Sequence, residues 1–477
     1  MGHREPYFEL TKHIAKAQDV SLVHLYIHYP KEVMALWEMY WLKNKKDKKD
    51  RFEIIGAGRM YEPEDAWGLS HERLLLMYFP VSGIQTGMSE MLMVHSEEAV
   101  DFIIRFIDKC AKHFASIRWE SDPIEEITLV MPDGSTRRKI GNQSIWNIYR
   151  ATSGYAMPDL IHCIHMALEN YLLEGAKDKE RIGEIKNIID KILDKAECLS
   201  LIAVVASVVT SHVNEFFEEA ILLTSNLKIL RLDLARYTRE LSSNMIEFAY
   251  HRNTSMLDER RKSNALPHRK KHLENVLSEI QVRYEQSQSE FDKIKLEQAY
   301  RNVDSLREQL NQIPEEERVL YKFILSRCDV RTMKREVVEV NGVQAIQYTP
   351  ALDEEQRRLT EKSKRDNEDM MVGVTMRMWV KYRMRGEMDK IKSNPYECNP
   401  LRALADSKKI KKQFEVKEGG LSLLPGDEYV PSMVCALMLT DFYDKISPED
   451  KVYCEKEVIE TLLDVNEMVD SSMSSFI

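Results

Sequence analysis

The stretch of sequence that decides the fold is an almost wholly apolar run, Leu199-Ser200-Leu201-Ile202-Ala203-Val204-Val205-Ala206-Ser207-Val208-Val209-Thr210. A helix that is apolar on all sides must be buried on all sides, inside a large protein body or a membrane. The run is too short to cross a bilayer, because a membrane-spanning helix needs about 20 apolar residues. It therefore predicts a central helix with other helices packed around it.

The residues around this run have the same helical character. A second apolar segment, residues 160–174, lies between Pro158 and Gly175. Proline in the first turn of a helix and glycine just past its end are typical helix boundaries. We therefore expect residues 144–240 to form the core against which the rest of the chain packs.

Composition places the chain among folded, mainly helical proteins. Of its 477 residues, 43% are hydrophobic and 31% are charged, with only 17 Gly and 15 Pro. So few turn-forming residues favour long helices over a turn-rich β fold. The formal net charge of −10 excludes a general attraction of the whole chain to nucleic acid and leaves only local basic patches for such a contact.

Cysteine usage and the N-terminal residues predict the cellular compartment. The seven cysteines show no CxxC spacing and are odd in number, which indicates reduced thiols. The first residues contain no apolar segment of the kind found in signal peptides. We therefore expect a cytoplasmic protein without a membrane partner.

Two β-hairpins are predicted as small insertions between helices. The first, residues 125–140, turns on Pro132-Asp133-Gly134-Ser135, and the second, residues 335–348, turns on Asn341-Gly342. Both turn sequences are strong turn formers. Residues 269–311 predict one long helix with an exposed, charged side, whereas the glycines and proline of residues 52–69 predict irregular structure.

Helix pairs joined by short connections predict a mainly α fold. We expect an irregular α-solenoid, or helical-repeat body, with the two hairpins inserted. The chain divides by composition into four segments: an N-terminal helical segment with an irregular linker (1–69), a central helical-repeat core (70–250), a region with a long charged helix (251–385) and a loop-rich segment ending in a helix pair (386–477).

No motif of a nucleotide-binding or catalytic site occurs in the sequence. It lacks GxxxxGK[ST], GxGxxG, HExxH and GxSxG. His162, His165 and Glu169 share one face of the predicted helix, but a metal site would also need a ligand from another segment. A histidine pair packed between helices explains the same spacing. We therefore expect no cofactor, no metal ion and no assigned catalytic residue.

A basic turn at residues 260–272 is the strongest candidate for a functional surface. Arg261 and His268, with six residues between them, resemble the Arg and His that act at the scissile phosphate in HEPN-type ribonucleases. Pro267 would break the helix that those enzymes use. A solvated charged face explains the same residues. The candidate contacts to phosphate or nucleic acid are Arg260, Arg261, His268, Arg269, Lys270 and Lys271.

Several strings, in their order along the chain, resemble the helical region of large bacterial ATP-binding proteins, the STAND-type NTPases associated with antiphage defence. The strings are Tyr78-Phe79-Pro80-Val81-Ser82, Gly141-Asn142-Gln143, Tyr149-Arg150, Met166-Ala167-Leu168-Glu169, Leu172-Leu173-Glu174, Ala203-Val204-Val205-Ala206-Ser207-Val208, Glu259-Arg260, Ser263-Asn264, Leu266-Pro267-His268-Arg269 and Leu273-Glu274. The resemblance covers roughly residues 70–470. It implies a scaffold or sensor role. Because the sequence contains no motif that could bind a triphosphate, the resemblance assigns ATP hydrolysis to none of these residues.

The leading hypothesis is a non-catalytic helical scaffold or sensor of a bacterial NTPase-linked antiphage system, with a protein partner. One alternative is a HEPN-like ribonuclease that uses Arg261 and His268. Another is a nucleic-acid-binding scaffold that uses the basic turn 260–272. The sequence does not specify the partner's identity or the oligomeric state.

Overall fold

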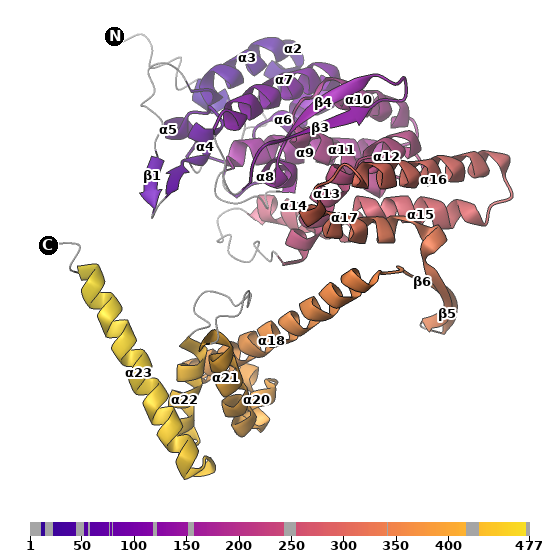
Figure 1. Ribbon diagram of the computed structural model, residues 1–477. Coiled ribbons are helices and arrows are strands. Elements are labelled where there is room, and N and C mark those ends of the chain that lie inside the picture. Colours follow the sequence, from indigo (N-terminus) through magenta and orange to yellow (C-terminus); the bar gives the residue numbers. More distant parts are fainter. Residues whose placement is uncertain are drawn as a thin grey trace, which may run out of the picture. The chain divides into compact units, whose positions relative to one another are not determined.

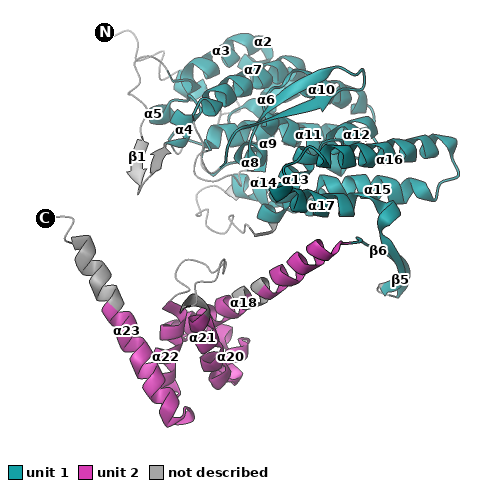
Figure 2. Ribbon diagram, viewed as in Figure 1, with its two compact units in different colours: residues 1–351 teal, residues 352–477 magenta. Residues whose placement is uncertain are grey.

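A computed structural model describes residues 11–14, 22–43, 52–55, 58–75, 77–78, 80–117, 122–150, 157–242, 254–340, 342–415 and 429–473. The protein is mainly helical and divides into two compact units, Met1–Ala351 and Leu352–Ile477 (Figures 1 and 2). Each unit has its own hydrophobic core. The division lies inside the segment predicted as 251–385, just before α18 (Glu354–Arg385) begins.

The central helix of unit 1 is α11 (Leu199–Ser211), as the apolar run predicts. Its residues are buried from Leu199 to Thr210. It contacts α8 (Gln143–Asn147), α9 (Asp159–Ala176), α10 (Ile182–Lys195), α12 (Phe217–Thr224) and α15 (Leu273–Glu285). Within the described ranges, no helix is both long enough and apolar enough to cross a membrane.

The N-terminal part of unit 1 packs through aromatic side chains. Trp37 and Trp41, on α3 (Pro30–Trp41), are stacked with ring centroids 5.4 Å apart. Both rings also approach Phe102 of α7 (Ser96–Ala115). The other helices of this part are α2 (Val23–His28), α4 (Pro63–Ala66), α5 (His71–Leu74) and α6 (Met88–Val94).

Both predicted hairpins are confirmed. The first is formed by β3 (Glu125–Val130) and β4 (Thr136–Gly141), and the second by β5 (Lys334–Val340) and β6 (Val343–Thr349). In the second turn, Gly342 has a left-handed φ of 79°, whereas Asn341 lies outside the described residues.

A third antiparallel pair, β1 (Phe52–Ile55) and β2 (Gly58–Tyr61), forms where irregular structure was predicted. That prediction was wrong for these residues. The residues just before Gly56, Phe-Glu-Ile-Ile, include three that favour strands. A strand this short gives too few alternating residues for its period to be recognised.

The prediction of one long helix over residues 269–311 was also wrong. The chain instead forms α15 and α16 (Glu290–Leu310), which pack against each other. Ser289 is the N-cap position of α16, and the Ser287 hydroxyl donates to Asp292 at 2.6 Å. Serine favours helix starts over helix interiors. Because α15 and α16 both contact α12, the chain reversal buries the apolar faces of both against the same body.

The remaining elements of unit 1 connect these parts: η2 (Ile148–Arg150), α13 (Leu227–Ser242), α14 (Thr254–Asn264), η4 (Pro267–Lys270), α17 (Glu315–Cys328) and η5 (Val330–Thr332). Pro267 is the first residue of η4. Proline is tolerated there, because the N–H that it lacks has no partner within the helix at this position.

Unit 2 is a smaller helical body with a tryptophan at its centre. Trp379 of α18 is fully buried and stacks on Phe442, with ring centroids 5.9 Å apart. Its indole N–H donates to Glu397 at 2.9 Å. The unit also contains α19 (Met388–Ile391), α20 (Pro395–Cys398), α21 (Pro400–Glu415), α22 (Val430–Asp441), η7 (Tyr443–Lys445) and α23 (Pro448–Met473). The predicted C-terminal helix pair is α22 and α23, which pack together.

Candidate functional site

The basic turn is split between buried and exposed side chains. Four of its six predicted contacts are at least partly exposed: Arg260, Arg261, Lys270 and Lys271. Two of these are ion-paired, Arg261 with Asp258 at 3.0 Å and Lys271 with Glu279 at 2.7 Å. The guanidinium of Arg260 donates to two backbone carbonyls at 3.4 Å each.

The other two predicted contacts, His268 and Arg269, are buried. The guanidinium of Arg269 pairs with Glu169 at 2.7 Å, and the Ser207 hydroxyl donates to the same carboxylate at 2.5 Å. His268 Nε2 lies 3.1 Å from the Ser207 hydroxyl. His268 therefore lies in the core, whereas Arg261 is exposed to solvent. The ribonuclease hypothesis requires Arg261 and His268 in one site, but in the structure the two side chains lie in different environments.

Arg150 continues this network with one ion pair and two further hydrogen bonds. Arg150 donates to Glu240 at 2.7 Å, to Ser263 at 3.2 Å and to Asn264 at 2.5 Å. Arg269 also donates to the Ser263 hydroxyl, at 3.3 Å. Side chains from five of the strings that carry the resemblance, together with Glu240, thus form one mostly buried hydrogen-bonded network. Such a network stabilises the fold, and its polar groups already have their hydrogen-bond partners within the protein.

Burial and the neighbouring guanidinium have opposite effects on the pKa of Glu169. Burial alone would raise the pKa of this carboxyl, but Arg269 and the Ser207 hydroxyl outweigh it and lower the pKa to about 2. Glu169 is therefore ionised and paired. His165 has both ring nitrogens in hydrogen bonds, to the Ile161 carbonyl and the Ser200 hydroxyl, each at 2.7 Å. Neither group is available as a metal ligand, and among the side chains described no group of three could hold a metal ion.

Four buried histidines predict a loss of stability in mild acid. Burial, the largest cause, lowers the pKa of His162 and His268 to about 3 and that of His165 and His272 to about 4. Their folded pKa lies below the unfolded value of about 6.5, so the unfolded chain binds more protons as the pH falls below that value. We expect the free energy of unfolding to fall by about 1 kcal/mol per histidine at about pH 5.5.

Urea denaturation at about pH 7.5 and about pH 5.5 measures this effect before most carboxylates titrate. A His165→Gln variant should show a smaller difference between the two conditions. Equal stability at both pH values, or higher stability in acid, would contradict the neutral, buried state of these histidines.

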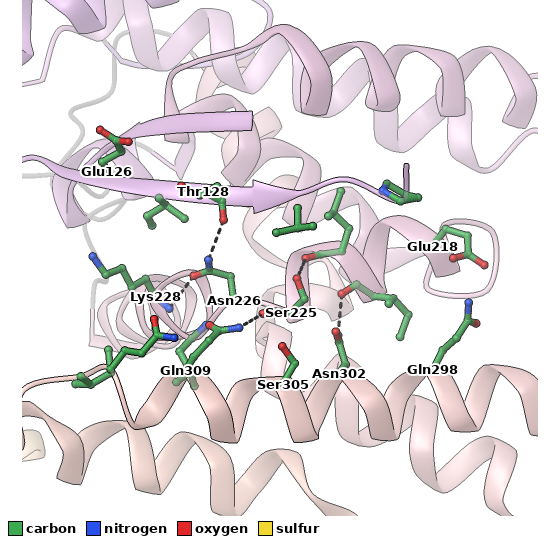
Figure 3. Close-up of a pocket in the computed structure, with 18 residues that line it drawn as sticks. Glu126, Thr128, Glu218, Ser225, Asn226, Lys228, Gln298, Asn302, Ser305 and Gln309 are labelled. Carbon is green, nitrogen blue, oxygen red and sulfur yellow. Dashed lines mark hydrogen bonds between the residues drawn. The ribbon is translucent and has the colours of Figure 1, made fainter. Parts of the chain in front are cut away.

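A groove of about 800 Å³ opens on unit 1. β3 forms one wall, the connection between α12 and α13 forms the floor, and α16 forms the other wall (Figure 3). Its volume lies within the range of roughly 300–1,000 Å³ that ligand sites occupy. We call it the amide groove, after four amide side chains that line it. Gln298, Asn302 and Gln309 lie on α16, and Gln312 follows just past its end; Ser305 of α16 lies among them.

The hairpin wall is held firmly from the far side of the groove. Lys139 of β4 is buried, and its ammonium donates to the carbonyls of Leu193 and Ala196. Burial lowers the pKa of Lys139 to about 8. The β4 backbone also bonds outward, from the amide of Ile140 to the carbonyl of Glu197 at 2.7 Å.

That outward bond determines which edge of β3 faces the groove. Ile140 lies opposite Glu126 in the hairpin register. The backbone N–H and C=O of Ile140 point away from β3. In an antiparallel pair, the N–H and C=O of Glu126 and of every second residue after it therefore point away from β4. Asn226 confirms this direction, because its side-chain amide donates to the Thr128 carbonyl at 3.3 Å. The outward backbone groups belong to Glu126, Thr128 and Val130.

The amide groove was not predicted from the sequence. The available signal was a stripe of uncharged polar residues on a predicted helix, at positions 298, 302, 305 and 309. Successive gaps of four and three residues place them on one helix face, where a packed helix usually carries apolar residues. The opposing wall comes from β3, and the sequence does not show that distant pairing.

No known protein family model matches this chain, and no curated protein matches it either. The resemblance to STAND-type NTPases therefore stays a prediction.

Proposed function

We propose that this protein is a non-catalytic helical scaffold or sensor, which binds a protein partner as part of a bacterial NTPase-linked antiphage system. The observation that carries the binding role is the amide groove, which is open and lined by side chains with hydrogen-bonding capacity to spare. The link to an NTPase and to defence rests on the resemblance of the sequence strings.

The contacts of the basic turn support a scaffold over the two alternatives. A ribonuclease would need Arg261 and His268 together at one phosphate, but Arg261 pairs with Asp258 while His268 lies against Ser207. A nucleic-acid scaffold would need several free cations. Within the turn, Arg269 pairs with Glu169 and Lys271 with Glu279.

Phage protection provides a test in cells. In bacteria that carry the coding region with its neighbouring genes, we expect Ser305→Trp to abolish protection, because the indole would fill the groove. Arg261→Ala should leave protection unchanged. Protection should be measured by plaque counts, with the level of each variant checked by immunoblot.

The same two variants test the alternatives. The purified chain should cleave no RNA. Metal-independent cleavage that Arg261→Ala abolishes would establish the ribonuclease instead. RNA binding that weakens steeply with salt and with Arg261→Ala would establish the nucleic-acid scaffold. Protection by Ser305→Trp at the level of the unmodified protein would overturn the role of the groove.

A further inference from the structure

The amide stripe runs from Gln298 on α16 to Gln312 just past its end, and it contains both occupied and unoccupied hydrogen-bonding groups. Asn302 donates to the Ile221 carbonyl at 2.8 Å, and Gln309 donates to the Ser225 carbonyl at 2.7 Å. These two side chains hold the floor of the groove. Within the described part of the chain, nothing hydrogen-bonds the side chains of the other three, Gln298, Ser305 and Gln312, which line the groove.

The charges around the groove disfavour an anionic ligand. Two of its charged side chains are ion-paired, Lys228 with Glu125 at 3.2 Å and Glu126 with Arg138 at 2.6 Å. A third, Glu218, is exposed and adds negative charge. A phosphate backbone binds through free Lys and Arg side chains, and the lining offers none.

The types of side chain in the lining exclude two further ligand classes. No aromatic residue, histidine or cysteine lines the groove. Bases of single-stranded nucleic acid need aromatic stacking platforms, and the lining holds no histidine to activate a serine or threonine as a nucleophile. Beside seven apolar residues, the lining offers uncharged donors and acceptors, which suit a ligand with alternating N–H and C=O groups.

We infer that the amide groove binds an extended, uncharged segment of a partner protein by hydrogen bonds to its backbone. The inference rests on the proposed function, because it specifies the form of the partner that the scaffold binds. Each Gln side chain has one acceptor and two donors, so it can pair with an N–H and a C=O of an extended chain whatever the side chains of that chain are.

The dimensions of the two walls fit an extended peptide. Gln298 and Gln309 lie about 16 Å apart along the axis of α16, at about 1.5 Å per residue. An extended chain covers that length with about five residues, at roughly 3.4 Å each. On the opposite wall, the outward backbone groups of Glu126, Thr128 and Val130 repeat every second residue, as those of a peptide strand do. Of these, the Thr128 carbonyl is already bonded to Asn226.

Selection from a library tests the inference on the full chain. The probe is a phage-displayed library of random peptides of about 10 residues, enough to span the stripe. Selected peptides are synthesised with a fluorophore, and binding is measured by fluorescence anisotropy. We expect Gln298→Ala/Gln312→Ala to weaken binding by about tenfold or more through the loss of two side-chain partners. The matched control, Gln286→Ala/Gln288→Ala, changes two exposed glutamines between α15 and α16 and should bind like the unmodified protein.

Backbone recognition has its own signature. N-methylation of alternate peptide amides should abolish binding, whereas alanine substitution of single peptide side chains should have small effects. The opposite pattern would overturn backbone recognition. A library that yields no peptide sensitive to the double variant would overturn the inference, and so would a single-stranded oligonucleotide or an oligosaccharide that binds the groove instead.

The two proposals can fail separately. If Ser305→Trp abolishes phage protection but no extended peptide binds, the groove has a different kind of partner and the scaffold role stands. If Ser305→Trp leaves protection intact while peptides still bind, the groove recognises peptides but its role in defence is wrong.

Discussion

Replacing Arg269 with alanine is expected to destabilise unit 1 by about 3–5 kcal/mol, the cost typical of breaking a buried ion pair from one side. Glu169 is fully buried, and Arg269 is the cation that pairs with it. Without that cation, the carboxylate would either remain charged in the core or take up a proton, and each outcome costs free energy. Urea denaturation near neutral pH measures the loss.

The matched control is Arg261→Ala, eight residues earlier in the same basic turn. Arg261 is 63% exposed in its side chain and pairs with Asp258. Exposed pairs of this kind contribute roughly 0.3–0.5 kcal/mol. If the two variants lose the same stability, the buried network has been assigned wrongly. A Glu169→Gln/Arg269→Met variant should recover part of the loss, since it removes both charges together.

The second large effect is expected at the central helix. Leu201→Ala in α11 should cost about 2–5 kcal/mol, because a fully buried leucine leaves a cavity that its neighbours fill only in part. The control is Leu320→Ala in α17, where the leucine is 46% exposed and the expected change is within about 0.5 kcal/mol. A small loss at Leu201 would mean that α11 is not the centre of the core.

The parts of the fold that follow from local sequence were predictable. The apolar run at 199–210 requires burial on all sides, and α11 is buried throughout. The turn Pro132-Asp133-Gly134-Ser135 lies between strand-forming residues, and a hairpin forms there. Each of these features is specified within a dozen neighbouring residues, so tertiary contacts did not change the result.

Apart from the short pair β1 and β2, the wrong predictions depended on distant contacts. The charge pattern of 269–311 fits a single helix, and only packing of both halves against α12 explains the reversal at Ser287 and Ser289. The basic turn looked solvated, yet Arg269 and His268 are buried because Glu169 and Ser207 supply partners from other helices. A sequence pattern shows the charge of a side chain, but it does not show which charged groups lie next to that side chain in the folded protein.

The amide groove was unpredictable for the same reason. Its stripe on α16 is visible in the sequence, but the opposing wall, Glu126 to Val130, precedes it by more than 150 residues. By itself, the stripe indicates the solvent-exposed side of a polar helix. Only the fold shows that it faces the outward edge of a strand across a groove.

The most direct test of the central claim, that the amide groove binds a protein partner, is site-specific photo-crosslinking in bacteria. A photoreactive amino acid replaces Ser305 in the groove, and the same amino acid replaces Gln286, outside it, in the control. We predict a covalent adduct at position 305 with an extended segment of one protein, identified by mass spectrometry, and no adduct with that segment from position 286. An RNA adduct at position 305, or the same set of adducts from both positions, would contradict the account.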